Sequence, residues 1–177
     1  MDTEQQISIY TDGACSPNPG PGGYGVIIEQ NDHIVELSGG FSNTTNNRME
    51  ILGAIRGLDA LTDDQVKRGE IAIYSDSRYV VDMFNGGYAE KWRANGWRLA
   101  SRQPAQNIDL WAELLTLAET RRVSFHWVKG HNEHPQNERC DELAVLARQQ
   151  DGLPPDEGYA PAVVQSAPEQ LSLFDSI

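Results

Sequence analysis

The sequence contains few cysteines and no long apolar run, and both absences narrow the class of protein. Two cysteines, Cys15 and Cys140, occur in 177 residues. Two are too few for a disulfide framework, so we expect a reducing, cytoplasmic location. We find no N-terminal apolar segment of the secretory type and no run of about 18 apolar residues, the length that spans a bilayer. We therefore expect a monomeric protein without a membrane partner.

Basic residues are scarce as well, with 14 Lys and Arg against 26 Asp and Glu and a net charge of −12. This balance argues against a general nucleic-acid binder, because binding to phosphates by charge alone requires a basic face. One segment, residues 88–102, differs from the rest because it combines four basic residues and two tryptophans with a single acid. The basic residues are Lys91, Arg93, Arg98 and Arg102, and the tryptophans are Trp92 and Trp97. Local charge can therefore matter more here than the total.

The apolar pattern predicts one α/β domain with a mixed sheet over residues 1–150. Strands are predicted over residues 7–12, twice within 24–41 around an Asn31–Asp32 turn, and over 69–77 and 122–130. Helices are predicted over 46–61, 107–119 and 137–149, with a short helix that begins at Arg78. Residues 151–169 are acidic, contain prolines and lack any period, which indicates a flexible linker before a terminal motif at 170–177.

Three glycines after the first predicted strand match the spacing G-x-G-x-x-G, namely Gly20, Gly22 and Gly25. A dinucleotide site of this type requires a helix directly after the glycines, because the helix N-terminus holds the pyrophosphate. The following residues, Val26 to Ile28, instead predict a strand. We therefore interpret the glycines as part of a tight connection between neighbouring strands.

Four acidic residues stand at positions where side chains could converge. Asp12 and Asp76 each end a predicted strand, and the carboxyl ends of strands form sites in α/β sheets. Glu50 lies in the first turn of its helix, and Asp141 borders the inward stripe of the last helix. Converging carboxylates repel one another unless cations lie between them, and a set of oxygen ligands suits Mg²⁺ or Mn²⁺. Two such ions would support phosphodiester hydrolysis, although each acid alone is also compatible with a cap or a surface charge.

Four segments resemble the motifs of one enzyme family and follow its order. They are YTDGACSPNPGPGGYG (10–25), TTNNRMEI (44–51), YSDSRYV (74–80) and HWVKGHNEHPQNERCDELA (126–144). From about Ile7 to Arg148 the chain is similar to bacterial type 1 ribonucleases H. The resemblance implies a ribonuclease H-like fold, with a mixed five-stranded sheet flanked by helices. It also implies metal-dependent hydrolysis of the RNA strand of RNA·DNA hybrids to 3′-hydroxyl and 5′-phosphate ends.

The resemblance assigns roles to individual residues. The metal-binding acids match Asp12, Glu50, Asp76 and Asp141. A histidine that can relay protons or ease product departure matches His131. Residues that line the minor groove of the hybrid match Cys15, Asn18, Asn46 and Asn47, while Thr45 matches a contact to a DNA-strand phosphate. Arg78 stands where many relatives have Gln, so the contact to RNA there becomes more electrostatic. Trp92 matches the basic protrusion that grips the DNA strand. That protrusion is depleted of charge here, because Ala94, Asn95 and Gly96 occupy positions that are often basic, which predicts weaker and salt-sensitive binding.

The last residues carry a separate motif outside the family resemblance. Gln170, Leu171, Leu173 and Phe174 resemble the short motif by which bacterial replication and repair proteins bind the β sliding clamp. The Gln170 amide can form hydrogen bonds, and the apolar side chains can fill pockets of a partner. The alternative is that Leu173 and Phe174 fold back onto their own domain.

Two other functions fit parts of the sequence. A non-catalytic hybrid-binding module on the same scaffold would be expected to lack at least one metal-binding acid, and all four are present. A DNA-acting nuclease of the wider superfamily, such as a resolvase or transposase, would share the acids but not the segments around Cys15 and Asn46 that match contacts to a 2′-hydroxyl. Cleavage of a labelled hybrid compared with duplex DNA and duplex RNA distinguishes the three.

Overall fold

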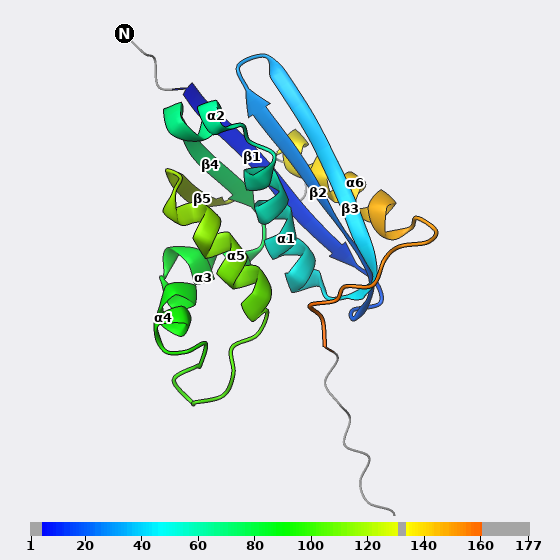
Figure 1. Ribbon diagram of the computed structural model, residues 1–177. Coiled ribbons are helices and arrows are strands. Elements are labelled where there is room, and N and C mark those ends of the chain that lie inside the picture. Colours follow the sequence, from blue (N-terminus) through cyan, green and yellow to red (C-terminus); the bar gives the residue numbers. More distant parts are fainter. Residues whose placement is uncertain (1–4, 131–133, 161–177) are drawn as a thin grey trace, which may run out of the picture.

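The computed structural model describes residues 5–130 and 134–160, and Figure 1 labels its elements. The strands are β1 (Gln5–Cys15), β2 (Gly20–Gln30), β3 (His33–Thr44), β4 (Gly69–Ser75) and β5 (Val123–Trp127). The helices are α1 (Asn46–Asp59), α2 (Asp63–Arg68), α3 (Arg78–Asn85), α4 (Tyr88–Ala94), α5 (Ile108–Glu119) and α6 (Pro135–Arg148). Within these described residues, no helix has the length and apolar character needed to cross a bilayer.

The five strands form one mixed sheet in the order β3-β2-β1-β4-β5. β1 and β2 pair antiparallel, as do β2 and β3, whereas β4 runs parallel to both β1 and β5. The carboxyl ends of β1, β4 and β5 therefore meet at one edge of the sheet. The predicted α/β fold with a mixed five-stranded sheet is confirmed.

Helices cover both faces of this sheet (Figure 1). α1 packs on β1 and β2 and contacts α5, and α6 packs across β1, β2 and β3. Apolar side chains spaced along α1, including Ile51, Ile55 and Leu58, are fully buried against strand residues such as Ile9 and Ile73. The hydrophobic core thus holds α1 rigidly against the strands whose ends carry the predicted acids.

The prediction of a strand after the glycines is confirmed, but the prediction that the glycines form the connection between strands is wrong. Gly20, Gly22 and Gly25 lie inside β2, and the connection from β1 is residues 16–19. The glycines have a packing reason. A Cβ added at Gly25 would overlap the Cys140 carbonyl oxygen, and one added at Gly23 would overlap the Ala144 carbonyl oxygen. The backbone of α6 therefore approaches β2 at a distance that only glycine allows.

Several elements differ from their sequence predictions, among them α4, a helix within the basic segment for which no helix was predicted. β1 continues to Cys15 because Gly13, Ala14 and Cys15 pair with β2, so Asp12 lies within the strand and not at its end. α2 was not predicted. It has six residues and none is buried, so it lacks an apolar stripe, and a capping box between Thr62 and Gln65 marks its start.

Residues 151–160 differ from the predicted flexible linker. They form no helix or strand, but the Ser42 N–H donates a hydrogen bond to the Pro154 carbonyl at 2.9 Å. The Asp156 carboxylate accepts hydrogen bonds from Thr44 and Arg48. Figure 1 shows this orange segment running from α6 to the N-terminal end of α1. The linker prediction is therefore wrong for these ten residues, because a buried ion pair fixes them to the domain.

Candidate active site

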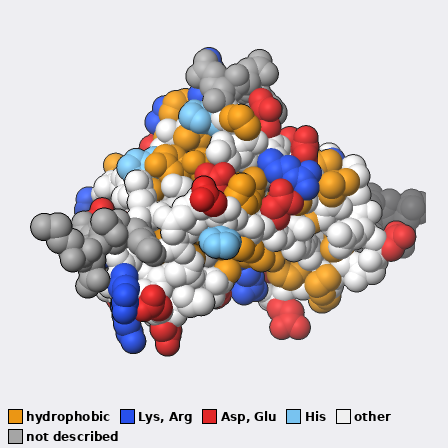
Figure 2. Space-filling view, turned by 90° about the horizontal axis from the view of Figure 1, so that it is seen from above, with side chains coloured by type: hydrophobic (Ala, Val, Ile, Leu, Met, Phe, Trp, Pro, Cys, Tyr) orange, Lys and Arg blue, Asp and Glu red, His pale blue; other side chains and the backbone are white. Residues whose placement is uncertain are grey.

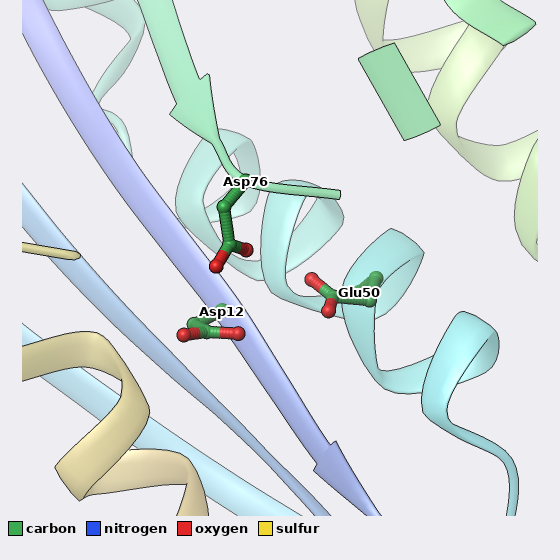
Figure 3. Close-up of side chains that lie close together, drawn as sticks. All are labelled: Asp12, Glu50 and Asp76. Carbon is green, nitrogen blue, oxygen red and sulfur yellow. The ribbon is translucent and has the colours of Figure 1, made fainter. Parts of the chain in front are cut away.

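Three of the predicted acids converge where β1, β4 and α1 meet. Asp12, Glu50 and Asp76 each offer a carboxylate oxygen, and these atoms lie within 4.8 Å of one another. The parallel register pairs Thr11 with Ser75, so the next residues, Asp12 and Asp76, stand side by side. Glu50 comes from the second turn of α1, and not from the first turn as predicted, and it points toward both (Figure 3). The sheet register and one helix packing therefore create the cluster.

Burial and mutual repulsion govern the charge of these acids. Asp12 is 6% exposed and Glu50 is 5% exposed. Burial, and then the negative charges of Asp76 and Asp141, raise the pKa of Asp12 to about 8. Burial, and then the charges of Asp12 and Asp76, raise the pKa of Glu50 well above its ordinary value. The cluster therefore retains protons at neutral pH unless cations neutralise it.

The cluster fits a divalent cation by the nature of its donor atoms. Glu50 Oε2 is buried and has no hydrogen-bond partner among the described residues, so it is a free ligand atom in the interior. All three donors are hard carboxylate oxygens, the ligands that Mg²⁺ and Mn²⁺ prefer over zinc-type sulfur and nitrogen sets. An unpaired buried carboxylate is costly, and a bound cation removes that cost.

Asp141 lies on α6, partly exposed, and outside the group of mutually close ligand atoms found among the described residues. Its charge nevertheless reaches Asp12 strongly enough to contribute to the raised pKa there. The structure therefore brings three of the four predicted acids into one cluster and leaves Asp141 at its border.

Asp76 has neighbours that the sequence did not single out. Asn137 of α6 is 3% exposed and donates a hydrogen bond from Nδ2 to Asp76 Oδ2 at 3.4 Å. Trp127 donates from Nε1 to the Asp76 carbonyl at 3.0 Å, and Gly130 packs against the carboxylate so closely that a Cβ there would overlap it. Asn137 stands one helical turn before Asp141, on the same face of α6. This spacing from a predicted site acid is the sequence feature that could have identified Asn137 as a site residue.

The predicted minor-groove residues gather beside the acids. The Asn18 side-chain oxygen accepts a hydrogen bond from the Asn46 N–H at 3.2 Å, and Asn46 Nδ2 donates to Glu50 Oε1 at 3.3 Å. Thr45 caps α1, where its hydroxyl oxygen accepts from the Arg48 N–H. A groove next to this cap is lined by Asn18, Thr45 and Asn47. A set of short polar side chains thus adjoins the carboxylate cluster.

The remaining predicted site residues occupy varied surroundings. The Cys15 thiol is partly exposed and donates to carbonyls, among them Thr44 O at 3.4 Å, and burial raises its pKa. The Arg78 guanidinium lies over the Trp127 ring at 3.6 Å from its centroid. Trp92 is partly buried and packs edge-on against Trp111, so it contributes to the core as well as to the surface. His131 and the tail residues Gln170, Leu171, Leu173 and Phe174 lie outside the described residues.

Positive charge is dispersed over one face of the described molecule. On the face shown in Figure 2, Lys and Arg side chains occur as separate small groups among acidic ones, without a continuous basic area. Arg93 of the predicted basic segment pairs with Glu119 at 2.7 Å, which neutralises part of that segment. This ion pair is consistent with the depleted positive charge predicted for residues 88–102.

Comparison with known families and sequences gives a consistent assignment. A family model described as RNase H matches residues 4–149. Ribonuclease H of Desulforamulus reducens is 54% identical over 152 residues, which cover 86% of this chain and 93% of that protein. Ribonuclease HI of Synechocystis sp. is 49% identical over 158 residues, covering 89% of this chain and 96% of that protein.

Solved structures with the same fold include two that are described as RNase H1. LC9-RNase H1, a type 1 RNase H with the type 2 active-site motif, has a TM-score of 0.71 and 30% identity, covering 82% of this chain and 73% of its own. LC11-RNase H1, solved in complex with an RNA/DNA hybrid, has a TM-score of 0.62 and 27% identity, covering 80% of this chain and 95% of its own.

Proposed function

Because the chain belongs to the ribonuclease H family, we propose that it hydrolyses the RNA strand of RNA·DNA hybrids and leaves 3′-hydroxyl and 5′-phosphate ends. The observation that carries the proposal is the cluster of Asp12, Glu50 and Asp76 at the end of the parallel strands. A relative of known structure, LC11-RNase H1, binds an RNA/DNA hybrid. A metal-binding cluster beside short polar side chains is the arrangement that such a substrate requires.

The acids of this chain would hold divalent cations, Mg²⁺ or Mn²⁺ and two of them with substrate. Asp12, Glu50 and Asp76 supply the central ligands and Asp141 the bordering one. Bound cations of this kind supply an activated water nucleophile and stabilise the leaving oxygen. Asn46 and Asn137 hold Glu50 and Asp76 in position by hydrogen bonds to their carboxylates.

Selection of the hybrid would come from residues that detect the 2′-hydroxyl on one strand. Asn18, Asn46 and Asn47 carry amides that both donate to and accept from a hydroxyl, and Cys15 lines the same region. Thr45, which caps α1, contacts a DNA-strand phosphate, while Trp92 and the neighbouring basic residues contact the DNA strand further along. Arg78 donates to the RNA strand beside the acids.

His131 is the proposed proton-relay residue. It follows Gly130, which packs against the Asp76 carboxylate, so the chain enters the 131–133 segment directly beside the acids. An imidazole titrates near neutral pH and can therefore donate a proton to a leaving oxygen or accept one from water. Replacement of His131 by Ala should lower kcat far more than it raises KM, and an unchanged kcat would contradict the assignment.

The decisive experiment compares three substrates of one sequence with Mg²⁺ present: a labelled RNA·DNA hybrid, duplex DNA and duplex RNA. We expect cleavage of the RNA strand of the hybrid and none of the other two, with product ends identified by their mobility and by ligation. Cleavage of duplex DNA would favour a DNA-acting nuclease. Binding of the hybrid without cleavage would favour a non-catalytic module.

We also infer that the tail residues Gln170, Leu171, Leu173 and Phe174 bind the β sliding clamp. Because residues 151–160 are fixed to the domain, the tether consists of residues 161–169 and is shorter than the sequence alone indicates. A tether to a clamp already on DNA would raise the effective concentration of the hybrid. The free thiols Cys15 and Cys140 fit the reducing cytoplasm in which replication occurs.

The full chain with Leu173→Ala and Phe174→Ala tests the tail. We expect loss of binding to purified clamp on a sensor surface, with the melting temperature and hybrid cleavage of the wild type. A large fall in melting temperature would instead indicate that these side chains fold back onto the domain.

A further inference from the structure

Residues 154–159, here called the C-terminal strap, are fixed to the domain by buried contacts. The Asp156 side chain is 5% exposed. Its carboxylate accepts a hydrogen bond from the Thr44 hydroxyl at 2.6 Å and two from Arg48, from Nε at 2.7 Å and from Nη2 at 3.0 Å. The Pro154 carbonyl accepts from the Ser42 N–H. The strap is thus bound to the end of β3 and to the first turns of α1.

Arg48 connects this strap to a third element. Its guanidinium donates from Nη1 to Asp109 Oδ1 at 2.9 Å and from Nη2 to Asp109 Oδ2 at 2.6 Å, so it is bidentate to carboxylates on both sides. Burial alone would raise the pKa of Asp109, but the hydrogen bonds and charge of Arg48 lower it. Gly158 packs over this pair, and a Cβ there would overlap both Asp109 and Arg48. β3, α1, α5 and the strap therefore share one ion-pair network.

Residues that precede and follow Thr45 in the chain both belong to this ion-pair network. Thr44 and Arg48 are held by Asp156, and the Arg48 N–H donates to the Thr45 hydroxyl oxygen at 3.3 Å. A hydroxyl that accepts one hydrogen bond still carries a proton that it can donate to a ligand. Gly158 and Tyr159 of the strap line the same groove as Asn18, Thr45 and Asn47. Arg48 itself is 3% exposed and paired with two acids, so it does not supply a free charge to the groove.

We propose that the C-terminal strap is part of the substrate-binding apparatus. Asp156 is a positioning residue that fixes the Thr45 end of α1 through Thr44 and Arg48, and Tyr159 completes the wall of the groove. The ligand of this groove is the sugar-phosphate backbone of the DNA strand of the hybrid. The inference rests on the proposed hybrid substrate, and it extends the binding surface into a segment whose composition alone indicates a linker.

The variant Asp156→Asn in the full chain tests this role, because an amide preserves volume but cannot pair ionically with Arg48. We expect the KM for a labelled hybrid to rise at least about fivefold, with a smaller change in kcat, since a displaced contact weakens binding before it affects the reacting atoms. Glu157→Gln is the matched control, because it removes the same charge from an exposed side chain of the same segment. Measurements are made well below the melting temperature of each variant.

An effect of the Asp156 charge alone and a positioning effect of Asp156 predict opposite changes of KM in the Asp156→Asn variant. Removal of a negative charge near a phosphate site would lower KM if charge alone mattered, whereas loss of positioning raises it. A KM equal to or below that of the wild type in folded Asp156→Asn protein would overturn the proposal. A wild type that does not cleave the hybrid would instead overturn the proposed function, so the two failures are distinguishable.

A second variant and a chemically modified substrate test the role of the strap without depending on how well Asp156→Asn folds. Gly158→Ala retains every charge but forces the strap away from Asp109 and Arg48, and it should raise KM in the same way. Hybrids with one neutral methylphosphonate at successive DNA-strand positions should identify a position whose penalty is large with wild type and small with Asp156→Asn. Equal penalties at every position in both proteins would show that the strap does not act on a DNA-strand phosphate.

Discussion

Asn46 and Glu50 lie one turn apart on α1, and the Asn46 side chain donates a hydrogen bond from Nδ2 to Glu50 Oε1 at 3.3 Å. The Asn46 N–H also donates to the Asn18 side-chain oxygen, whereas Glu50 belongs to the carboxylate cluster. The proposed contact to the substrate and the proposed metal site therefore share one turn of helix. A shift of the Asn46 side chain would therefore change the hydrogen bond that it donates to the Glu50 carboxylate.

Asn46→Asp should impair cleavage more than Asn46→Ala does. The aspartate replaces a donor by a fourth carboxylate one turn from Glu50, and like charges at this spacing repel. We expect the alanine variant to lose about 10-fold in kcat/KM, in the range seen when a hydrogen bond to a metal-binding residue is removed. Magnesium titrations of cleavage measure both effects. Equal activity of the two variants would show that the Asn46–Glu50 hydrogen bond does not matter to the metal site.

Asp12→Asn should abolish cleavage, by at least about 100-fold, because one metal-binding carboxylate is lost while the volume is unchanged. The same variant should be more thermally stable than the wild type at pH 8.5 without metal. The reason is that Asp12 adds a charge to a buried cluster that already contains Glu50 and Asp76. Calorimetry with a chelator present gives the melting temperatures. Cleavage at the wild-type rate would show that the site is misassigned.

The metal-free protein should lose stability as the pH rises toward 8. The pKa of Asp12 is about 8 in the folded state, against 3.8 for an ordinary aspartate. Between these values the folded state binds a proton that the unfolded state has released, so stability is complete below the lower pKa and is lost through the higher one. The slope for a single group cannot exceed about 1.4 kcal/mol per pH unit.

Urea unfolding in the presence of chelator, at several pH values from 5 to 9, measures this slope. Asp12→Asn is the control, because it should remove the part of the slope that Asp12 contributes. Added Mg²⁺ should restore stability at pH 8.5 by neutralising the cluster. A free energy of unfolding that rises from pH 5 to pH 8 without metal would contradict the raised pKa of Asp12.

Most of the fold follows from patterns that act over a few residues. Alternating and continuous apolar residues identified the strands, and the stripe containing Ile51, Ile55 and Leu58 identified α1. The acids could be proposed as a cluster because β1 and β4 were expected to end at the same edge. Their actual contact depends on the pairing of Thr11 with Ser75, which is a register that the sequence does not encode locally.

The C-terminal strap could not be predicted, because no local pattern marks it. Residues 151–160 have no period, contain two prolines and are acidic, which is the composition of a linker. Their order comes from contacts between residues far apart in the chain, such as the ion pair between Arg48 and Asp156, which are separated by 108 positions. The role of Asn137 could not be predicted either, because it depends on the approach of α6 to Asp76.

Arg78→Gln should make hybrid binding less dependent on salt. The Arg78 guanidinium lies over the Trp127 ring, and its pairing with Asp82 is long, at 3.8 Å, and exposed. Its N–H edge is therefore available to a phosphate oxygen of the RNA strand. Loss of one phosphate contact should reduce the slope of log affinity against log salt by about 1.

The affinity of Arg78→Gln for the hybrid is measured at several salt concentrations with Ca²⁺ in place of Mg²⁺. Arg68→Gln is the control, since Arg68 lies in α2 just before β4, at the end of that strand opposite Asp76. Trp127→Leu should raise KM and reduce the slope partially, because Arg78 then loses the ring that orients it. A slope unchanged in Arg78→Gln would mean that Arg78 contacts no phosphate.

Gly25→Ala and Gly53→Ala should change stability in opposite directions. A Cβ at Gly25 would overlap the Cys140 carbonyl, so β2 and α6 must separate, and overpacking of this kind costs about 1–3 kcal/mol. A Cβ at Gly53, within α1, meets its nearest neighbour at an ordinary 3.4 Å, and alanine in a helix is better than glycine by up to about 1 kcal/mol. Urea unfolding of both variants measures the difference. If Gly25→Ala were as stable as the wild type, the glycines of β2 would need an explanation other than the close approach of α6.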